Sequence, residues 1–304
     1  MKRRYQDFNS HLRKQFGCRV QKIALDAGLG CPNRDGTIST AGCIYCDDRG
    51  SGSGAYKKGL SISEQISRAK DALRRRYKAT KFIAYFQAFT NTYGPLEKLK
   101  GLYEEALKDP DVVGISIGTR PDCIENDVID LLETYTKDRL VWIEYGLQST
   151  HNATLSTINR GHDWRCFVEA VERTHGRGIQ ICTHIILGLP GEGRDEMMET
   201  ARQISGLGID GIKIHSLYIV RGTRMEDLYD EGKYSCLDQD EYAKLACDVL
   251  EILPPDMVIQ RLTGDPNPAE SVAPSWALKK SQTLRLISDL LEGRDSYQGK
   301  HYSV

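Results

Sequence analysis

The segment CPNRDGTISTAGCIYC, residues 31–46, contains three cysteines in the spacing C-x11-C-x2-C. Cys31, Cys43 and Cys46 provide one thiolate fewer than the four ligands that a structural zinc site takes. Three thiolates can hold three corners of a four-iron cluster and leave the fourth iron open for chemistry. Asn, Asp and Gly between the first two cysteines favour turns, which suits a loop that wraps a compact object. The spacing therefore indicates a 4Fe-4S cluster.

Two other interpretations of this loop stay open. A zinc site could be completed by a distant residue such as His11 or Cys18, or Cys43 and Cys46 could form a redox pair. Neither accounts for the motifs found further along the chain. The remaining cysteines lack metal-ligand spacing, and we expect ordinary buried residues at Cys18, Cys123, Cys166, Cys182, Cys236 and Cys247.

Length and composition fit a packed globular protein. The chain has 304 residues, of which 40% are hydrophobic, enough for one large barrel or two ordinary domains. Nine cysteines and no apolar segment at the start predict a reducing compartment. No apolar run approaches the ~20 residues of a membrane-spanning helix. We therefore expect a cytoplasmic protein with no membrane contact.

Positive charge is concentrated in two segments, although the net charge is only -1. Residues 1–22 contain seven Lys or Arg against one Asp, and residues 68–81 again contain seven against one. Such clusters are typical of surfaces that contact the phosphates of a nucleic acid. The alternative is that both are solvated helix faces with no partner.

Strand-like and helix-like patterns alternate along the chain. The capping box formed by Ser61 and Glu64 predicts a helix that runs to Tyr77, after a Gly- and Ser-rich connection at residues 47–59. Further helices are expected near residues 96–108, 126–136, 164–176, 195–207, 239–253 and 278–291. Strands are expected at residues 19–26, 81–87, 112–118, 140–148, 180–188, 211–218 and 257–262. This βα alternation predicts parallel strands with helical crossovers, in a barrel or a doubly wound sheet.

Polar and glycine-rich sequences follow six of these strands. The cysteine loop, FTNTYG, TRPD, GLQS, GLPGE and SLYIVRGT each stand where a strand ends. Because parallel barrels build their active sites at the carboxyl ends of their strands, this recurrence favours a barrel. The Pro-rich segment 260–276 is too irregular for a barrel repeat and is expected to close the opening of the barrel.

These features resemble the radical S-adenosylmethionine (SAM) enzymes. Those enzymes place three cysteines in the loop after the first barrel strand, with an aromatic directly before the last one, as Tyr45 stands here. The long first gap resembles the branch that contains the Elongator catalytic subunit. The resemblance runs from about Val20 to about Thr223 and implies an α/β fold, a partial (β/α)6 TIM-like barrel that binds a 4Fe-4S cluster and SAM. We therefore expect a basic arm at residues 1–18, the barrel at 19–224 and a C-terminal extension at 225–304.

The resemblance also implies positions that hold SAM. Thr90, Asn91 and Thr92 stand where the family commonly has a Gly-Gly-Glu motif for the methionine amino group, although the glutamate is absent here. Backbone carbonyls are the alternative ligands for that group. Residues 144–149 match the E-x-G-x-Q-S pattern of the Elongator branch, in which strand-four residues contact the SAM ribose or carboxylate; these are Glu144, Gln148 and Ser149. A salt bridge to a neighbouring Arg or Lys is the other interpretation of Glu144.

The segment ILGLPGE resembles the fifth-strand segment whose backbone lies along adenine, and it contributes Ile186, Gly188 and Gly191. A plain turn is the alternative. Arg120, Arg160 and His215 are the catalytic candidates, because a guanidinium group can hold a carboxylate or phosphate through two hydrogen bonds. His184 and His215 could equally be structural.

Four motifs, QAFTNTYGP, TRPDC, NRGH and QRLTGD, resemble the small bacterial YtqA-like (MnmL) group. That resemblance implies reductive cleavage of SAM and action on the wobble uridine of tRNA, converting 5-carboxymethylaminomethyluridine to 5-aminomethyluridine. It also implies an electron donor such as flavodoxin or ferredoxin. The alternatives are a radical SAM enzyme acting on a small metabolite or porphyrin precursor, and a non-catalytic zinc-binding RNA module.

Overall fold

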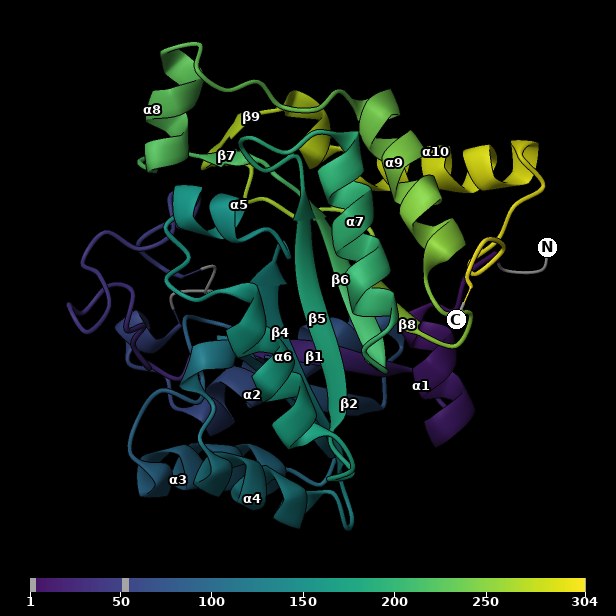
Figure 1. Cartoon of the computed structure of the whole chain (residues 1–304). Coiled ribbons are helices and arrows are strands. Elements are labelled where there is room, and N and C mark those ends of the chain that lie inside the picture. Colours follow the sequence, from purple (N-terminus) through teal and green to yellow (C-terminus); the bar gives the residue numbers. More distant parts are fainter. Residues whose placement is uncertain (1–3, 51–54, 304) are drawn as a thin grey trace.

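The computed structural model describes residues 4–50 and 55–303. Seven parallel strands form one curled sheet in the order β1-β2-β3-β4-β5-β6-β8 (Figure 1). Neighbours in the sheet follow the order of the chain, as they do in a βα barrel. The strands are β1 (Val20–Leu25), β2 (Lys81–Phe86), β3 (Val112–Thr119), β4 (Leu140–Gln148), β5 (Gln180–Leu187), β6 (Gly211–Ser216) and β8 (Val258–Arg261).

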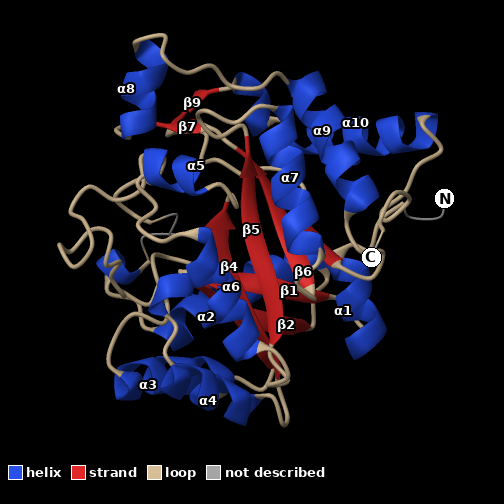
Figure 2. Ribbon diagram, viewed as in Figure 1, coloured by secondary structure: helices blue, strands red, loops and turns tan. Residues whose placement is uncertain are grey.

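Helices cover the outer face of the sheet, whereas short elements gather near its carboxyl end (Figure 2). The predicted βα alternation and the half-barrel fold are confirmed. The helices are α1 (Phe8–Phe16), α2 (Ile62–Tyr77), α3 (Leu96–Leu107), α4 (Asn126–Tyr135), α5 (Asn152–Thr157), α6 (Trp164–Thr174), α7 (Arg194–Ser205), α8 (Arg224–Asp230), α9 (Gln239–Ile252) and α10 (Lys280–Gly293). A two-stranded pair, β7 (Ile219–Val220) with β9 (Ser271–Ala273), completes the main elements.

Helix α2 begins at the predicted capping box. The Ser61 side chain accepts a hydrogen bond from the Glu64 backbone N–H, and the Glu64 carboxylate accepts one from the Ser61 N–H. Such a cap stabilises a helix by about 1 kcal/mol. Ile62 and Ile66 are buried against the sheet, and Lys78 ends the helix in the left-handed conformation. As a crossover between parallel strands, α2 carries its last turn, which includes Arg74 to Arg76, to the amino end of the sheet.

A hydrophobic cluster closes the amino end of the barrel. Leu12 of α1 packs there with Val20, Ile83, Trp142 and Val258, all buried. The main core lies between the sheet and the outer helices. Because apolar side chains fill the amino end, the polar carboxyl end is where the barrel opens.

The C-terminal part of the chain adds a seventh strand to the sheet. Strand β8, which the sequence placed in the extension, pairs in parallel with β6. The Pro-rich segment contributes β9, whose partner β7 follows β6. The extension therefore shares the sheet of the barrel. Part of the expected Gly- and Ser-rich connection, residues 51–54, lies outside the described residues.

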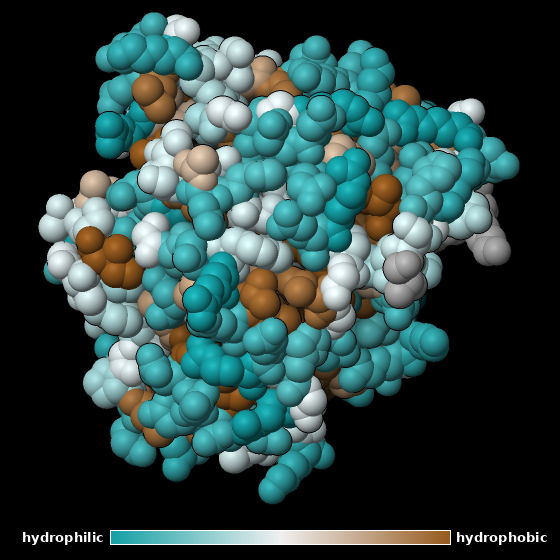
Figure 3. All heavy atoms as spheres, viewed as in Figure 1, coloured by the Kyte–Doolittle hydropathy of each residue, from teal (hydrophilic) through white to brown (hydrophobic). Residues whose placement is uncertain are grey.

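The surface seen in Figure 3 is mainly hydrophilic, with small apolar groups between the polar side chains. Such a mixture is usual for a protein face in contact with water. Among the described residues, no helix combines the length and the apolarity that crossing a membrane requires.

Candidate active site

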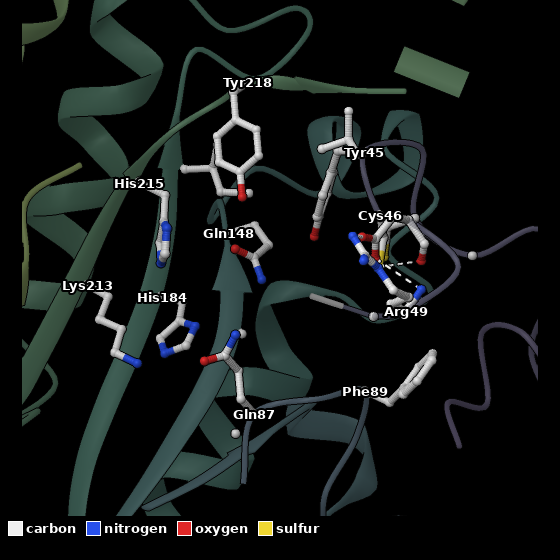
Figure 4. A pocket seen from close by; sticks show the side chains of 18 of the residues that line it. Tyr45, Cys46, Arg49, Gln87, Phe89, Gln148, His184, Lys213, His215 and Tyr218 are labelled. Atoms are coloured by element: carbon white, nitrogen blue, oxygen red, sulfur yellow. Dashed lines mark hydrogen bonds and ion pairs between the residues drawn. The ribbon is translucent and has the colours of Figure 1, made fainter. Parts of the chain in front are cut away.

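A cavity of about 550 Å³ opens at the carboxyl ends of the strands. We call it the mouth pocket. The cysteine loop (residues 31–46) forms one wall, and β5 and β6 form the facing wall through His184, Lys213 and His215 (Figure 4). The Pro-rich segment also contributes, with Asp265, Asn267 and Glu270 among the lining residues. The segment therefore lies over the opening, as the sequence led us to expect.

Side-chain hydrogen bonds brace the cysteine loop against the NRGH segment. Asn33 Nδ2 donates to the Asn159 carbonyl at 2.6 Å, and Asn159 Nδ2 donates to the Gly42 carbonyl at 2.6 Å. Arg34 donates to the carbonyls of Cys46 and Asp47, both at 2.6 Å. The loop is therefore held in a defined shape by groups outside its own backbone.

The cysteine thiols face guanidinium groups. Arg160 Nη1 lies 3.5 Å from Cys43 Sγ. Burial raises the pKa of Cys43, but Arg160 and then Arg120 outweigh it, so that the pKa falls below its ordinary value. Burial and the neighbouring Cys43 raise the pKa of Cys46 to about 12, against the opposing effect of Arg34. Positive charge beside a thiol favours the thiolate, the form that ligates metals.

Deeper in the pocket, Glu144 is fully buried and both of its carboxylate oxygens are bonded. One accepts from Lys22 and Ser116, and the other accepts from Lys213 and from His184 Nε2 at 2.7 Å. Although burial opposes ionisation, Lys213 and Lys22 hold the pKa of Glu144 well below its ordinary value. The salt-bridge interpretation of Glu144 is therefore the one the structure favours, and contact with SAM would require breaking these bonds.

The two pocket histidines are neutral near pH 7. Burial, followed by Lys213, lowers the pKa of His184 to about 4. Burial, followed by Arg261, lowers the pKa of His215 well below its ordinary value. Their rings lie 5.6 Å apart at 49°. Neutral imidazoles can accept or donate one hydrogen bond each, which suits contact with a polar ligand.

Acid is expected to destabilise the protein through His184. Its pKa is about 4 in the folded state against an ordinary 6.5, so the unfolded chain binds more protons between these values. The free energy of unfolding should therefore fall as the pH is lowered through this window, by up to about 1.4 kcal/mol per unit for this group. Urea titrations at several pH values should give a shallower dependence for His184→Gln than for wild type. The same substitution at exposed His301 is the control, and equal slopes for His184→Gln and wild type would contradict the expectation.

Three non-glycine residues around the site have left-handed backbone: Phe89 (φ 60°), Gln148 (φ 83°) and Asn159 (φ 52°). Phe89 and Gln148 line the mouth pocket, and Asn159 braces the cysteine loop. Backbone strain of this kind costs on the order of 1–3 kcal/mol per residue and concentrates at functional sites. Its position here supports a ligand-binding role for the pocket.

Comparison with known proteins now identifies the family. Residues 28–204 match the Radical SAM superfamily, and residues 209–292 match the Radical SAM C-terminal domain. The chain belongs to the radical SAM superfamily. It is 46% identical over 300 residues to YtqA of Bacillus subtilis, a match that covers 99% of this chain and 93% of YtqA.

Two further similarities connect the chain with the Elongator branch. It is 27% identical over 183 residues to human Elongator complex protein 3, covering 59% of this chain and 33% of that protein. The solved structure of the archaeal Methanocaldococcus infernus Elp3 shares the fold with a TM-score of 0.70 at 18% identity, covering 92% of this chain and 64% of that chain. The chain is thus a radical SAM enzyme, a family that uses a 4Fe-4S cluster and SAM, and it is similar to Elongator complex protein 3 over part of its length.

The residues of the mouth pocket fit these cofactors. Cys31, Cys43 and Cys46 are free thiols that line the cavity. Within the described ranges, no group of three His, Cys, Asp or Glu is arranged to hold a single metal ion. Thr90 Oγ1 and Arg120 Nη1 line the same cavity, are buried and have no hydrogen-bond partner in the described part of the chain. Unpaired buried polar atoms are costly, so these two atoms are suited to a bound polar ligand.

The structure separates the residues that would complete a zinc site from the cysteine loop. Cys18 precedes β1 and the loop follows it, so a six-residue strand, about 20 Å long, stands between them. The ring centroids of His11 and Trp142 lie 6.2 Å apart, beside the hydrophobic cluster that closes the amino end of the barrel. Neither residue lies beside the three thiols.

Of Thr90, Asn91 and Thr92, only Thr90 lines the mouth pocket. Asn91 Nδ2 donates to the Phe86 and Gly118 carbonyls, at 3.1 and 2.9 Å. The Thr92 hydroxyl bonds to the Thr119 hydroxyl at 2.6 Å and to the Cys123 carbonyl. Both side chains tie the ends of β2 and β3 together and neither lines the mouth pocket, so a SAM contact through them stays a prediction. Thr90 remains the candidate.

A similar division applies to the strand-four and strand-five motifs. Gln148 and Ile186 line the pocket, whereas the fully buried Ser149 donates to Glu192. Gly188 is covered by Tyr234, whose hydroxyl donates to its carbonyl at 2.6 Å, and Gly191 is a turn residue with φ 85°. Ser149, Gly188 and Gly191 do not line the mouth pocket, and the SAM contacts expected of them stay predictions.

Both arginines of the predicted clamp have hydrogen-bond partners within the protein. Arg120 makes two hydrogen bonds to Asp122, at 2.9 and 2.7 Å. Arg160 donates to the Gly146 carbonyl at 2.5 and 3.1 Å and faces Cys43. Arg160 therefore supports the cysteine loop, whereas Arg120 keeps Nη1 unpaired at the pocket; a clamp formed by these two residues stays a prediction.

The two basic segments meet at the end of the barrel opposite the mouth pocket. The Arg19 and Arg76 guanidinium groups both lie 5.1 Å from the Tyr77 ring, near the amino ends of β1 and β2. Arg74 is paired with Asp111 at 2.6 Å. Lys22, counted with the basic arm from sequence, is instead turned into the barrel toward Glu144, because strand alternation places it on the inner face.

Sequence reasoning missed Lys213 and Arg261 as pocket residues, and also Arg49, which pairs with Glu270 across the opening. The usable signal for Lys213 was a lysine inside the apolar strand GIKIHS, where burial of a charge requires a partner. Half of the remaining cysteines are only partly buried, namely Cys18, Cys166 and Cys236.

Proposed function

We propose that this radical SAM enzyme modifies the wobble uridine of tRNA and converts 5-carboxymethylaminomethyluridine to 5-aminomethyluridine. The observation that carries the proposal is that the cysteine loop and an inner wall of cationic side chains line the same pocket. Lys213 and Arg261 line that wall, and they suit a substrate that carries a carboxylate. The resemblance of QAFTNTYGP, TRPDC, NRGH and QRLTGD to the YtqA-like group supports the same substrate.

Cys31, Cys43 and Cys46 would hold the cluster, and Thr90, Gln148 and Ile186 would lie beside SAM. When bound, these cofactors supply one-electron chemistry that removes a hydrogen atom from carbon. The weakest accessible C–H bond of the proposed substrate lies on the methylene between nitrogen and carboxylate, since both neighbours stabilise a carbon-centred radical. The protein would position this methylene by binding the carboxylate, and the walls of the pocket would exclude water.

A radical SAM enzyme that acts on a small metabolite is the second candidate. A cavity of about 550 Å³ is within the size range of small-molecule sites. A non-catalytic zinc-binding RNA module would need a different metal. Protein purified without oxygen should be brown and contain iron and sulfide, whereas one zinc and no visible absorbance would favour the zinc module.

Mass spectrometry of tRNA nucleosides tests the proposed substrate. A deletion strain should accumulate 5-carboxymethylaminomethyluridine and lack 5-aminomethyluridine, and the wild-type gene should restore the product. Purified enzyme with SAM and a reductant such as flavodoxin should perform the conversion on tRNA from that strain. Unchanged nucleosides in the deletion strain, with purified enzyme inactive on tRNA, would reject this substrate.

The geometry also predicts which surface tRNA contacts first. A wobble base in the mouth pocket brings the anticodon phosphates to the rim of the pocket. Exposed Arg221 and Arg224 lie there. The Arg221 N–H donates to the Glu270 carbonyl, and the N–H of Met225, which follows Arg224, donates to the Ile44 carbonyl. Changing both to Glu should weaken tRNA binding and reduce the log-log salt dependence by roughly 1.4–1.8, because each phosphate contact contributes about 0.7–0.9.

The matched comparison is Arg75→Glu with Arg76→Glu on the basic face at the other end, which the sequence predicted to contact the RNA backbone. Binding curves at several salt concentrations should show a larger loss for the rim pair. A larger loss for the Arg75 and Arg76 pair would instead place the main RNA contact on the far face.

A further inference from the structure

Arg261 differs from the other cations of the mouth pocket. Five of the six Lys and Arg that line the pocket have hydrogen-bond partners for their side chains: Arg34, Arg49, Arg120, Arg160 and Lys213. For Arg261, no ion pair or side-chain hydrogen bond is found in residues 4–50 and 55–303. The pocket therefore contains a guanidinium group whose donors are available to a ligand.

A β-bulge directs Arg261 into the barrel. Between β6 and β8, Ile212 pairs with Ile259 but Lys213 pairs with Arg261, so Gln260 is the extra residue. Gln260 Oε1 accepts from Lys22 at 2.7 Å inside the barrel. Without the bulge, Gln260 and Arg261 would point to opposite faces of the sheet. The bulge lets both face inward and sets Arg261 beside Lys213.

The inner wall holds an excess of positive charge. Lys22 and Lys213 share one carboxylate, Glu144, Arg261 has no ion pair among the described residues, and the two histidines are neutral. Burial lowers the pKa of Lys213 to about 7, with Lys22 and Arg261 adding to the effect against Glu144. Like charges on paired strand positions repel each other. An anionic ligand between Lys213 and Arg261 would relieve this repulsion.

The position of Arg261 separates it from the cations that support the cysteine loop. Its charge acts on His215, His184 and Tyr218, which belong to the wall opposite the loop (Figure 4). Arg34 and Arg160, in contrast, bond the loop itself or its neighbour Gly146. The far wall is the side on which a substrate would meet cofactors bound at the loop.

We propose that Arg261 binds the carboxylate group of the substrate. This assignment rests on the proposed function and adds Arg261 to the earlier clamp candidates, Arg120 and Arg160. A guanidinium fork can donate two parallel hydrogen bonds to a carboxylate, which fixes both its position and its orientation. The methionine carboxylate of SAM has the same chemistry, so the test must separate these two sources.

The test uses the enzyme reconstituted without oxygen and saturated with SAM. The probes are N-methylglycine, which reproduces the carboxylate end of the proposed substrate, and its amide, which keeps the ammonium group but lacks the carboxylate, with binding followed by saturation-transfer NMR. We expect wild type to prefer the acid over the amide by about tenfold or more, since hydrogen bonds to charged groups are worth that much. Arg261→Gln should abolish this preference and Arg261→Lys should keep part of it. Arg165→Gln, on the exposed side of α6, is the matched control.

SAM affinity, measured by calorimetry on the same variants, separates the sources of the carboxylate. Loss of the acid preference in Arg261→Gln with SAM affinity retained supports the proposal. An acid preference that is absent in wild type or retained in Arg261→Gln overturns it, and a loss of SAM affinity assigns Arg261 to SAM instead. Conversion of tRNA by wild type is scored separately. If wild type converts no tRNA but its preference for the acid is lost in Arg261→Gln, the proposed uridine substrate is rejected and the proposed carboxylate site is supported.

Discussion

Replacing Cys31, Cys43 and Cys46 by alanine is expected to remove the iron-sulfur absorbance and all reductive cleavage of SAM. These thiols line the mouth pocket, Cys43 faces Arg160 and Cys46 lies beside Arg34, and thiolate is the usual ligand of such clusters. Iron and sulfide content, the visible spectrum and release of 5′-deoxyadenosine measure the effect. We expect a complete loss rather than a graded one, because no other described cysteine lines the pocket.

Cys18→Ala is the control for this experiment, since Cys18 lies before β1 at the closed end of the barrel. That variant should keep its iron and its SAM cleavage. Far-UV circular dichroism of the triple variant would show whether the fold survives. Full iron occupancy in a folded triple variant would contradict the assignment of the ligands.

Glu144→Gln is expected to destabilise the fold by about 3–5 kcal/mol. The substitution keeps the shape of the side chain but leaves Lys22 and Lys213 without a carboxylate in the interior, which is the costly way to break a buried ion pair. Urea unfolding of wild type and variant measures the change. Glu169→Gln, which removes an exposed partner of Arg165, should change the stability by about 1 kcal/mol or less.

A double variant distinguishes lost pairing from lost packing. Adding Lys213→Met to Glu144→Gln removes one of the stranded charges, so the combined loss should be smaller than the sum of the two single losses. Strict additivity would mean that Glu144 and Lys213 do not stabilise each other, against the geometry of the pair.

Local sequence patterns predicted most of the fold. The capping box at Ser61, the period of apolar residues in each helix and the apolar strands depend on contacts within a few residues, so they can be recognised in the chain itself. The cysteine spacing also belongs to one short loop. Polar strand ends then located the site, because the carboxyl ends of parallel strands meet at one end of a barrel.

The pairing of buried charges could not be predicted in the same way. Glu144 is bonded by Lys22, Lys213 and His184, which come from β1, β6 and β5. Which strands face each other across the barrel depends on the curl of the whole sheet. The sequence therefore left Glu144 open between a SAM contact and a salt bridge to an unnamed Arg or Lys, and it grouped Lys22 with a basic segment. Only the fold brought the two residues together.

The sequence by itself determined the βα order, the three-cysteine loop and the end of the barrel where the mouth pocket opens, since short-range patterns predict each of them. The tertiary structure decided which polar residues remain available for a ligand. Arg160 and Ser149 are held by partners within the protein, while the bulge at Gln260 turns Arg261 into the pocket with its donors available. The physical reason is that hydrogen-bond satisfaction depends on strand register and on contacts between residues far apart in the chain.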